Sequence, residues 1–280
     1  MYSFKKYLQN LLSWTGIYQR LKASYLYDIY WSIANKEIII ERNKEVEFYR
    51  TVLHGFQKGD LIYDVGANHG YKTDIFLRLG VKVIAIDPDE INQNILRQKF
   101  LRFRIKKKPV LIVAKAVSNR NSVQTMWIDE PGSAKNTLCQ KWVNTLRNDT
   151  RRFETYLVFT QKKEVPTVTL ESLIKAYGQP FFIKIDVEGH ELSVLEGLQQ
   201  SVPYLSFEVN LPEFKNEGIQ CIEILTLLED KAEFNYTACL SKGLFLEKWL
   251  QGSEFLDVYN QCSEKSIEIF WRTGNHIQSN

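Results

Sequence analysis

The sequence contains little that would link the chain to a metal, to disulfide bonds or to a membrane span. Its 280 residues include four cysteines, Cys139, Cys221, Cys239 and Cys262, and none of them forms a CxxC pair. This spacing indicates neither a zinc site nor a disulfide framework, and it fits a reducing, cytoplasmic setting. No apolar run reaches the roughly 18 residues that a spanning helix needs, and the N-terminus lacks the pattern of a secretory signal.

An excess of charge of one sign is also absent. The net charge is +3, which is too balanced to argue for nucleic acid as a partner. Hydrophobic residues make up 44% of the chain. A chain of this length and composition can bury a large core, in one large domain or two small ones.

The first 36 residues carry apolar side chains at helical spacing, with basic residues between them. This stretch, Met1–Lys36, predicts one or two helices. They would pack on the domain or on a partner subunit, or they would lie as an amphipathic helix on a membrane surface. Glu45–Leu53 predicts a further helix. We therefore predict an N-terminal helical extension, residues 1–58, followed by the main domain, residues 59–280.

The rest of the chain is organised around a strand, a glycine turn, a helix and a second strand. The apolar run Leu61–Val65 stops at the turn Gly66–Gly70, and a helical pattern follows as far as Gly80. The second run, Val81–Ile86, ends at Asp87. Glycines let a ligand approach the backbone, and an acid about 20 residues after the turn can accept hydrogen bonds from ribose hydroxyls. The pattern therefore predicts a nucleotide-type cofactor.

Two features of the turn favour one kind of ligand over another. The turn is not GxGxxG, which argues against a dinucleotide. Asp64 lies directly before it, where an acid would repel a pyrophosphate and would suit the amino group and sulfonium of S-adenosylmethionine. The alternatives are a nicotinamide-dependent oxidoreductase and an ordinary βαβ unit with a tight turn.

Further apolar runs predict the remaining strands. Val110–Val113 is expected as a third buried strand, and Val123–Ile128 alternates like an edge strand or hairpin. The other predicted strands are Phe181–Ile185, Tyr204–Val209, Phe234–Leu240 and Ser266–Trp271. Asp129–Lys163 shows no clean strand. We assign it to substrate binding, although a plain surface excursion fits nearly as well.

A second stretch with candidate functional residues is Phe181–Gly189, FFIKIDVEG. Asp186 and Glu188 lie at the carboxyl end of its predicted strand. Ligands of open α/β sheets bind outside the carboxyl ends of the strands. We therefore expect Asp64, Asp87 and Asp186 to gather at one edge of the sheet.

These motifs resemble the FkbM-like methyltransferases. The resemblance rests on DVGANHG at 64–70, AIDP at 85–88, VTLESL at 168–173 and KIDVEGHELSVLEG at 184–197. It implies a class I, Rossmann-like fold with a doubly wound, seven-stranded, mostly parallel sheet whose final strand is antiparallel. It also implies that S-adenosylmethionine is bound by Asp64, Gly66, Ala67, Asn68 and Gly70 at its methionine end, by Asp87 at the ribose, and by Ala116 and Val117 near adenine.

The resemblance further implies methyl transfer to a hydroxyl group of a sugar or secondary metabolite. A hydroxyl must lose its proton during or after transfer, so a positioned base is expected. Asp186 is the first candidate, followed by Glu188 and His190; each of them could instead have a structural role. A variant places a divalent metal between Asp186 and Glu208. The alternative to an enzyme is a non-catalytic scaffold that kept the fold for protein or membrane association.

Overall fold

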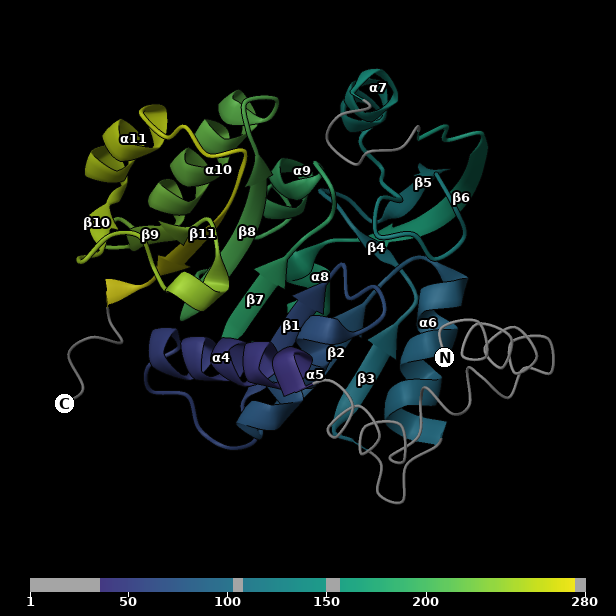
Figure 1. Cartoon of the computed structure of the whole chain (residues 1–280), viewed down its shortest axis with the longest axis horizontal. Helices are drawn as coiled ribbons and strands as arrows, with labels where there is room; N and C mark the ends of the chain where they lie inside the picture. The colour runs from purple at the N-terminus through teal and green to yellow at the C-terminus, as the bar shows by residue number, and fades with distance from the viewer. Residues whose placement is uncertain (1–35, 103–107, 150–156, 275–280) are drawn as a thin grey trace.

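The computed structural model describes residues 36–102, 108–149 and 157–274. The helices predicted within Met1–Lys36 therefore lie almost entirely outside the described residues. The centre of the molecule is an eight-stranded sheet in the order β10-β9-β11-β8-β7-β1-β2-β3 (Figure 1). Beside it lies a smaller sheet of three strands.

The main sheet is mostly parallel. The parallel neighbours are β3 (Val110–Val113), β2 (Lys82–Ile86), β1 (Leu61–Val65), β7 (Phe182–Ile185) and β8 (Tyr204–Asn210). β11 (Ser266–Arg272) runs antiparallel between β8 and β9 (Glu233–Thr237). The predicted seven strands and the antiparallel last strand are confirmed. The two-residue β10 (Leu250–Gln251) adds an eighth strand at the edge.

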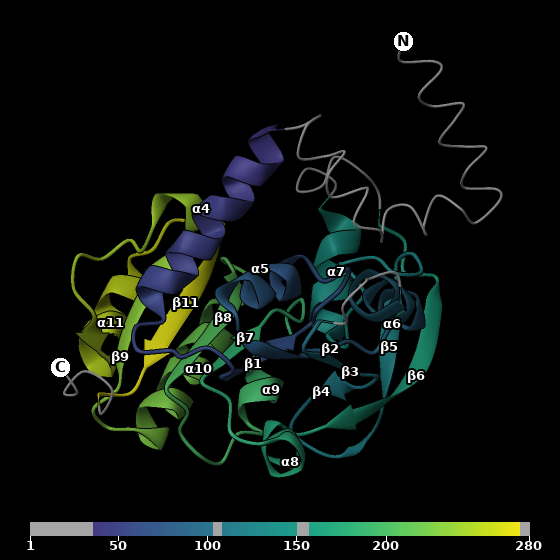
Figure 2. The same cartoon turned by 90° about the horizontal axis from the view of Figure 1, so that it is seen from below.

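Helices cover both faces of this sheet, as Figure 2 shows. One face packs against α4 (Lys36–Val52), α5 (Tyr71–Leu79) and α6 (Glu90–Arg97), which continues as a π-helical turn, Gln98–Arg102. The other face packs against α8 (Leu170–Tyr177), α9 (Glu191–Leu195), α10 (Lys215–Leu228) and α11 (Gly252–Asn260). The doubly wound α/β architecture is therefore confirmed.

The helix α4 is an integral part of the core. Tyr49 is fully buried, and its ring packs edge-on against Phe76 of α5 at a centroid distance of 5.0 Å. Phe48 meets Phe270 of β11 in the same way at 5.5 Å. Such aromatic contacts add to the hydrophobic stabilisation that burial of the rings provides. None of the helices in the described part of the chain is long and apolar enough to cross a membrane.

The smaller sheet has the order β4-β6-β5 and lies beside the carboxyl ends of β1 and β2. Its strands are β4 (Ala116–Val117), β5 (Ser122–Ile128) and β6 (Gln161–Val168). β5 pairs antiparallel with β6 and forms an edge, so the predicted edge strand at Val123–Ile128 is confirmed. The helix α7 (Gln140–Asn148) follows in the segment for which we predicted no element.

Several expectations need correction. β3 is not a buried strand: it is the last strand of the main sheet, and Leu111 is 44% exposed. The region Asp129–Lys163 does contain regular structure, namely α7 and the first residues of β6. The start of β6 was missed because Gln161–Glu164 is polar and exposed, so it carries no apolar alternation. The helix α11 and the strand β10 were not predicted either.

Candidate functional site

A cleft opens at the carboxyl ends of β1, β2 and β7. It encloses about 560 Å³ of empty space, counting its open mouth. Its lining includes eight of the residues proposed from the sequence: Gly66, Asn68, Asp87, Ala116, Val117, Asp186, Glu188 and His190. Residues that sequence reasoning did not single out also line it, among them Asn92, Lys115, Ser133, Asn136 and Thr137.

The turn after β1 is held tightly against its neighbours. The amides of Gly66 and Ala67 both donate to the carbonyl of Ile86, each at 3.0 Å. Gly66 has a φ of 83°, and a Cβ built on it would lie 1.8 Å from the carbonyl oxygen of Asp186. Only glycine fits where the backbone is left-handed and a second strand end approaches so closely. The turn and the end of β7 therefore form one wall of the cleft.

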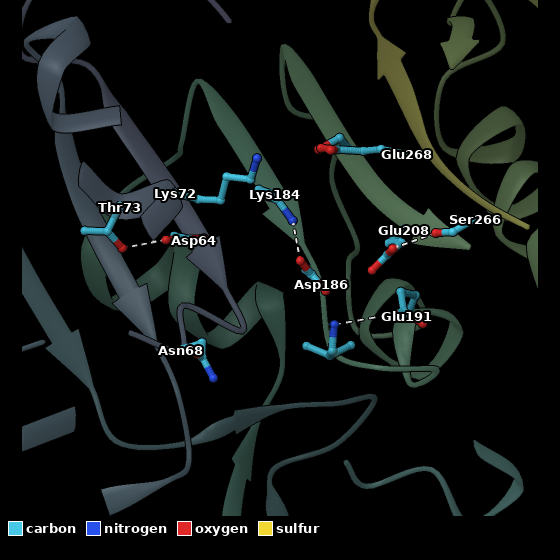
Figure 3. Close-up of polar contacts among 12 residues, drawn as sticks. Asp64, Asn68, Lys72, Thr73, Lys184, Asp186, Glu191, Glu208, Ser266 and Glu268 are labelled. Atoms are coloured by element: carbon cyan, nitrogen blue, oxygen red, sulfur yellow. Dashed lines mark hydrogen bonds and ion pairs between the residues drawn. The ribbon is translucent and has the colours of Figure 1, made fainter. Parts of the chain in front are cut away.

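Three residues that were expected to contact the cofactor do not line the cleft. Asp64 is 2% exposed and accepts a hydrogen bond from Thr73 Oγ1 of α5 (Figure 3). Burial raises the pKa of its carboxyl above the ordinary value. Ala67 is buried in the core beneath the turn, and Gly70 begins α5 with a φ of 73°. In this arrangement Asp64 links α5 to the sheet through Thr73, and its expected contact with a cationic ligand stays a prediction.

Asp87, at the end of β2, is held by three hydrogen bonds. Its Oδ1 accepts from the amide of Asp89 at 2.8 Å and from Asn92 Nδ2 at 3.2 Å. Its Oδ2 accepts from the amide of Asn68 at 2.8 Å. Burial nevertheless raises the pKa of Asp87 to about 6, because the carboxylate has little access to water. The acid is therefore fixed in position at the floor of the cleft.

The loop before α7 is attached to the rim of the cleft by one side chain. Asp89 caps α6 by accepting from the amide of Ile91, and its other oxygen accepts from the amide of Gly132 and from Asn136 Nδ2, each at 2.9 Å. These bonds bring Ser133 and Asn136 into the lining. Part of the segment that we assigned to substrate binding thus forms a wall of this cleft.

Asp186, at the end of β7, lies between this cleft and a second cavity. Lys184 is almost completely buried in the same strand, and its Nζ donates to Asp186 Oδ2 at 2.9 Å (Figure 3). Burial alone would raise the pKa of Asp186, but the ammonium of Lys184 and hydrogen bonds from Lys184 and Glu208 lower it below its ordinary value. Asp186 is therefore ionised at neutral pH.

The second cavity has an empty volume of about 710 Å³ and a polar wall. Asp186, Glu208 and Glu268 line it, together with Lys72 and Lys184, and hydroxyl groups come from Thr237 and Ser266. Ser266 Oγ donates to Glu208 Oε1 at 2.6 Å. Burial and the charge of Asp186 raise the pKa of Glu208 well above its ordinary value.

Glu188 is held in a strained loop. Its φ is 55°, which is uncommon for a residue other than glycine. Trp142 Nε1 of α7 donates to Glu188 Oε2 at 2.9 Å, and the carbonyl of Glu188 accepts from Thr137 Oγ1 at 2.8 Å. Burial and the charge of Asp186 raise the pKa of Glu188 to about 8. The side chain thus joins α7 to the wall of the cleft.

His190 lies on the side of the cleft formed by β4. Its Nε2 is 3.0 Å from Ser118 Oγ, which also accepts a hydrogen bond from Gln124 Nε2 at 3.0 Å. Burial lowers the pKa of His190 to about 4. The imidazole is therefore neutral at neutral pH.

Among the residues that the structure describes, no group of three or more histidine, cysteine, aspartate or glutamate side chains could hold a metal ion. Asp186 is hydrogen-bonded to Lys184, and Glu208 is hydrogen-bonded to Ser266.

Comparison with known proteins gives one extensive sequence match and several weak likenesses of fold. The family model described as the Methyltransferase FkbM domain matches residues 64–237. No match was found among curated proteins. A TehB-like SAM-dependent methyltransferase from Corynebacterium glutamicum has a TM-score of 0.42 at 9% identity, over 82% of this chain and 87% of that one. The plantazolicin methyltransferase BpumL, solved in complex with SAH, has a TM-score of 0.42 at 10% identity, over 91% and 95% of the two chains.

Proposed function

Because the chain belongs to the FkbM methyltransferase family, we propose that it transfers a methyl group from S-adenosylmethionine to a hydroxyl group of a sugar or another hydroxyl-rich acceptor. The observation that carries this proposal is the position of Asp186. Asp186 lines both the cleft beside the glycine turn and the polar second cavity. An acid at this junction can meet a cofactor from one side and an acceptor from the other.

The residues of the first cleft fit the cofactor. Asp87 offers a carboxylate for a ribose hydroxyl, and Gly66 leaves space that a Cβ would fill. Asn92, which lines the cleft, has a buried side-chain oxygen, Oδ1, without a hydrogen-bond partner among the described residues, as expected where a ligand supplies the donor. Ala116 and Val117 provide apolar surface for a base. When bound, S-adenosylmethionine supplies an electrophilic methyl group on a positively charged sulfur.

The second cavity supports a polar acceptor. Its wall contains carboxyl, ammonium and hydroxyl groups within reach of one another, and few large apolar side chains. Several hydrogen-bonding groups on a wall suit a molecule with several hydroxyls, because each would find a partner. Holding such an acceptor beside the methyl donor would supply much of the rate enhancement through proximity and orientation.

Within this proposal Asp186 accepts the proton of the attacking hydroxyl. The ammonium of Lys184 donates to this carboxylate and lowers its pKa, which keeps it ionised. We assign other tasks to the two further candidates. Glu188 holds its loop in position by accepting a hydrogen bond from Trp142. His190 contacts Ser118 and forms part of the wall near the proposed position of the adenine.

The test uses methyl-labelled S-adenosylmethionine with neutral sugars and with an extract of the host. We expect label in an alkali-stable ether product, and we expect Asp186→Asn to lower the rate by about 100-fold, as is typical when a general base is lost. Binding of S-adenosylhomocysteine should persist in this variant. The matched control is Asp257→Asn on the exposed side of α11, which should leave the rate unchanged.

Three outcomes would contradict the proposal in different ways. A label on nitrogen would replace the hydroxyl acceptor with an amine. An Asp186→Asn variant as active as the wild type would remove Asp186 from the proton transfer. Cofactor binding without transfer to any acceptor would favour the non-catalytic scaffold.

Three other expectations stay predictions. They are the cytoplasmic location, the contact of the N-terminal helices with a membrane, and the division of the chain at residue 58.

A further inference from the structure

Asn92 is a buried residue whose side-chain nitrogen is hydrogen-bonded within the protein and whose side-chain oxygen is not. It lies in the first turns of α6, is 2% exposed and lines the cleft beside Asp87. Its Nδ2 donates to Asp87 Oδ1 at 3.2 Å. Its Oδ1 has no partner among the described residues. A buried amide oxygen without a donor is costly, so its presence in a cleft requires an explanation.

The orientation of this amide follows from the acid next to it. If the amide were flipped, its oxygen would face Asp87 Oδ1, and two acceptors would meet without a proton between them. The hydrogen bond to Asp87 therefore turns the carbonyl of Asn92 away from the acid. Asn92 itself is one of the residues that line the same cleft.

The hydrogen bonds of Asp87 leave it with limited capacity for a ligand. A carboxylate offers about four lone-pair positions, two on each oxygen. The amide of Asp89 and Asn92 Nδ2 occupy both positions on Oδ1. The amide of Asn68 occupies one of the two on Oδ2. One position on Asp87 remains, whereas a ribose carries two neighbouring hydroxyl groups that each need an acceptor.

We propose that Asn92 supplies the second acceptor, so that Asp87 Oδ2 and Asn92 Oδ1 each bind one hydroxyl of the cofactor ribose. This inference rests on the proposed use of S-adenosylmethionine. It makes Asn92 a direct contact of the cofactor and a determinant of selectivity for a ribose with both hydroxyls. A site with two buried acceptors discriminates against a sugar that lacks either hydroxyl, because one acceptor then stays unpaired.

The test measures binding rather than turnover. Titration calorimetry would give the affinity of the wild type, Asn92→Ala and Asn94→Ala for S-adenosylhomocysteine and for its 2′-deoxy and 3′-deoxy analogues. Asn94 lies on the exposed side of the same helix and serves as the matched control. We expect Asn92→Ala to bind S-adenosylhomocysteine about tenfold more weakly, as for the loss of one hydrogen bond. Asn94→Ala should bind like the wild type.

The deoxy analogues separate a direct contact from an indirect effect through Asp87. For the analogue that lacks the hydroxyl bound by Asn92, the wild type and Asn92→Ala should bind within about twofold of each other, because the contact is absent in both. An equal loss for the parent compound and both analogues would mean that Asn92 only orients Asp87, and this would overturn the proposal. So would an Asn92→Ala variant with unchanged affinity.

The wild type alone provides a test that does not depend on the folding of a variant. Each deoxy analogue should bind about tenfold more weakly than the parent compound, because each hydroxyl has its own acceptor. If only one hydroxyl matters, the proposal for Asn92 is wrong although the cofactor assignment stands. If the wild type does not bind S-adenosylhomocysteine at all, the proposed function fails together with the inference.

Discussion

Replacing Asp87 with asparagine should raise the stability of the ligand-free protein relative to the wild type as the pH increases, and it should weaken cofactor binding. Asp87 is 5% exposed, and its pKa is raised from 3.8 to about 6 by burial. The folded state therefore holds the proton more tightly than the unfolded state. The corresponding stability is fully present below about pH 4 and is lost as the pH rises through about 6.

The size of the effect follows from the two pKa values. The difference between 3.8 and about 6 corresponds to about 3 kcal/mol of unfolding free energy, and about 2.5 kcal/mol of this is lost between about pH 4 and about pH 8. Asparagine cannot ionise, so the variant avoids this loss. Its NH₂ group must, however, face one of the amides that now donate to Asp87, which costs about 1 to 3 kcal/mol at every pH.

The assay is therefore urea unfolding of the wild type and Asp87→Asn across this pH range without ligand. The absolute difference in unfolding free energy mixes both effects, but its change with pH isolates the ionisation of Asp87. The variant should gain about 2.5 kcal/mol relative to the wild type between about pH 4 and about pH 8. Its affinity for S-adenosylhomocysteine should fall by about 1.5 to 3 kcal/mol at pH 7, since a charged acceptor is lost.

A difference in unfolding free energy that does not change with pH would refute this reasoning, because Asp87 would then have an ordinary pKa and burial would not disfavour its charge. Unchanged affinity would separately remove Asp87 from the ribose site. If both expectations hold, the buried carboxylate of Asp87 lowers the stability of the protein but strengthens cofactor binding, as is common at functional sites.

Three further predictions concern the same region. Gly66→Ala should destabilise the fold by at least about 2 kcal/mol and abolish cofactor binding, because the added Cβ would clash with the carbonyl oxygen of Asp186. The control Gly59→Ala has the same left-handed backbone but open space around it, so it should cost about 1 kcal/mol. Thermal unfolding of the two variants measures both costs, and equal costs would contradict the clash at Gly66. Lys184→Met should shift the acidic limb of the pH–rate profile to higher pH, because burial would then raise the pKa of Asp186 with no ammonium group to lower it. An acidic limb at the wild-type pH would contradict this role of Lys184. Trp142→Phe removes the hydrogen-bond donor of Glu188 and should raise the pKa of this carboxyl group above about 8. Nuclear magnetic resonance of the side-chain carboxyl groups would measure the pKa. A lower pKa in the variant would refute the hydrogen bond between Trp142 and Glu188.

The strands of the main sheet could be predicted from the sequence because they are short, apolar and bounded by glycine or acid. β1, β2 and β7 fall within a residue of the predicted ranges. Elements at the periphery were harder to predict. The strand β6 begins with exposed polar residues, and α7 lies in a segment rich in charge, so neither shows the periodicity on which such a prediction depends.

The site was predictable in its location and less so in its roles. Gathering Asp87 and Asp186 at one edge follows from the topology of a parallel sheet, and both line the cleft. The inward turn of Asp64 towards Thr73 depends on side-chain packing that spacing does not encode. Asn92 shows no signal in the sequence at all. Its importance emerges only when the hydrogen bonds of Asp87 are counted.

The anchoring of α4 reaches beyond the core to the second cavity. Glu45 pairs with Lys72, and the Tyr49 hydroxyl lies 3.4 Å from Glu268 Oε1; both partners line that cavity. A shortened chain beginning at residue 59 would lose both contacts and expose the aromatic cluster around Phe76. Such a truncation should therefore lower the affinity for an acceptor bound in that cavity, as well as the solubility, because α4 contacts two of the residues that line it.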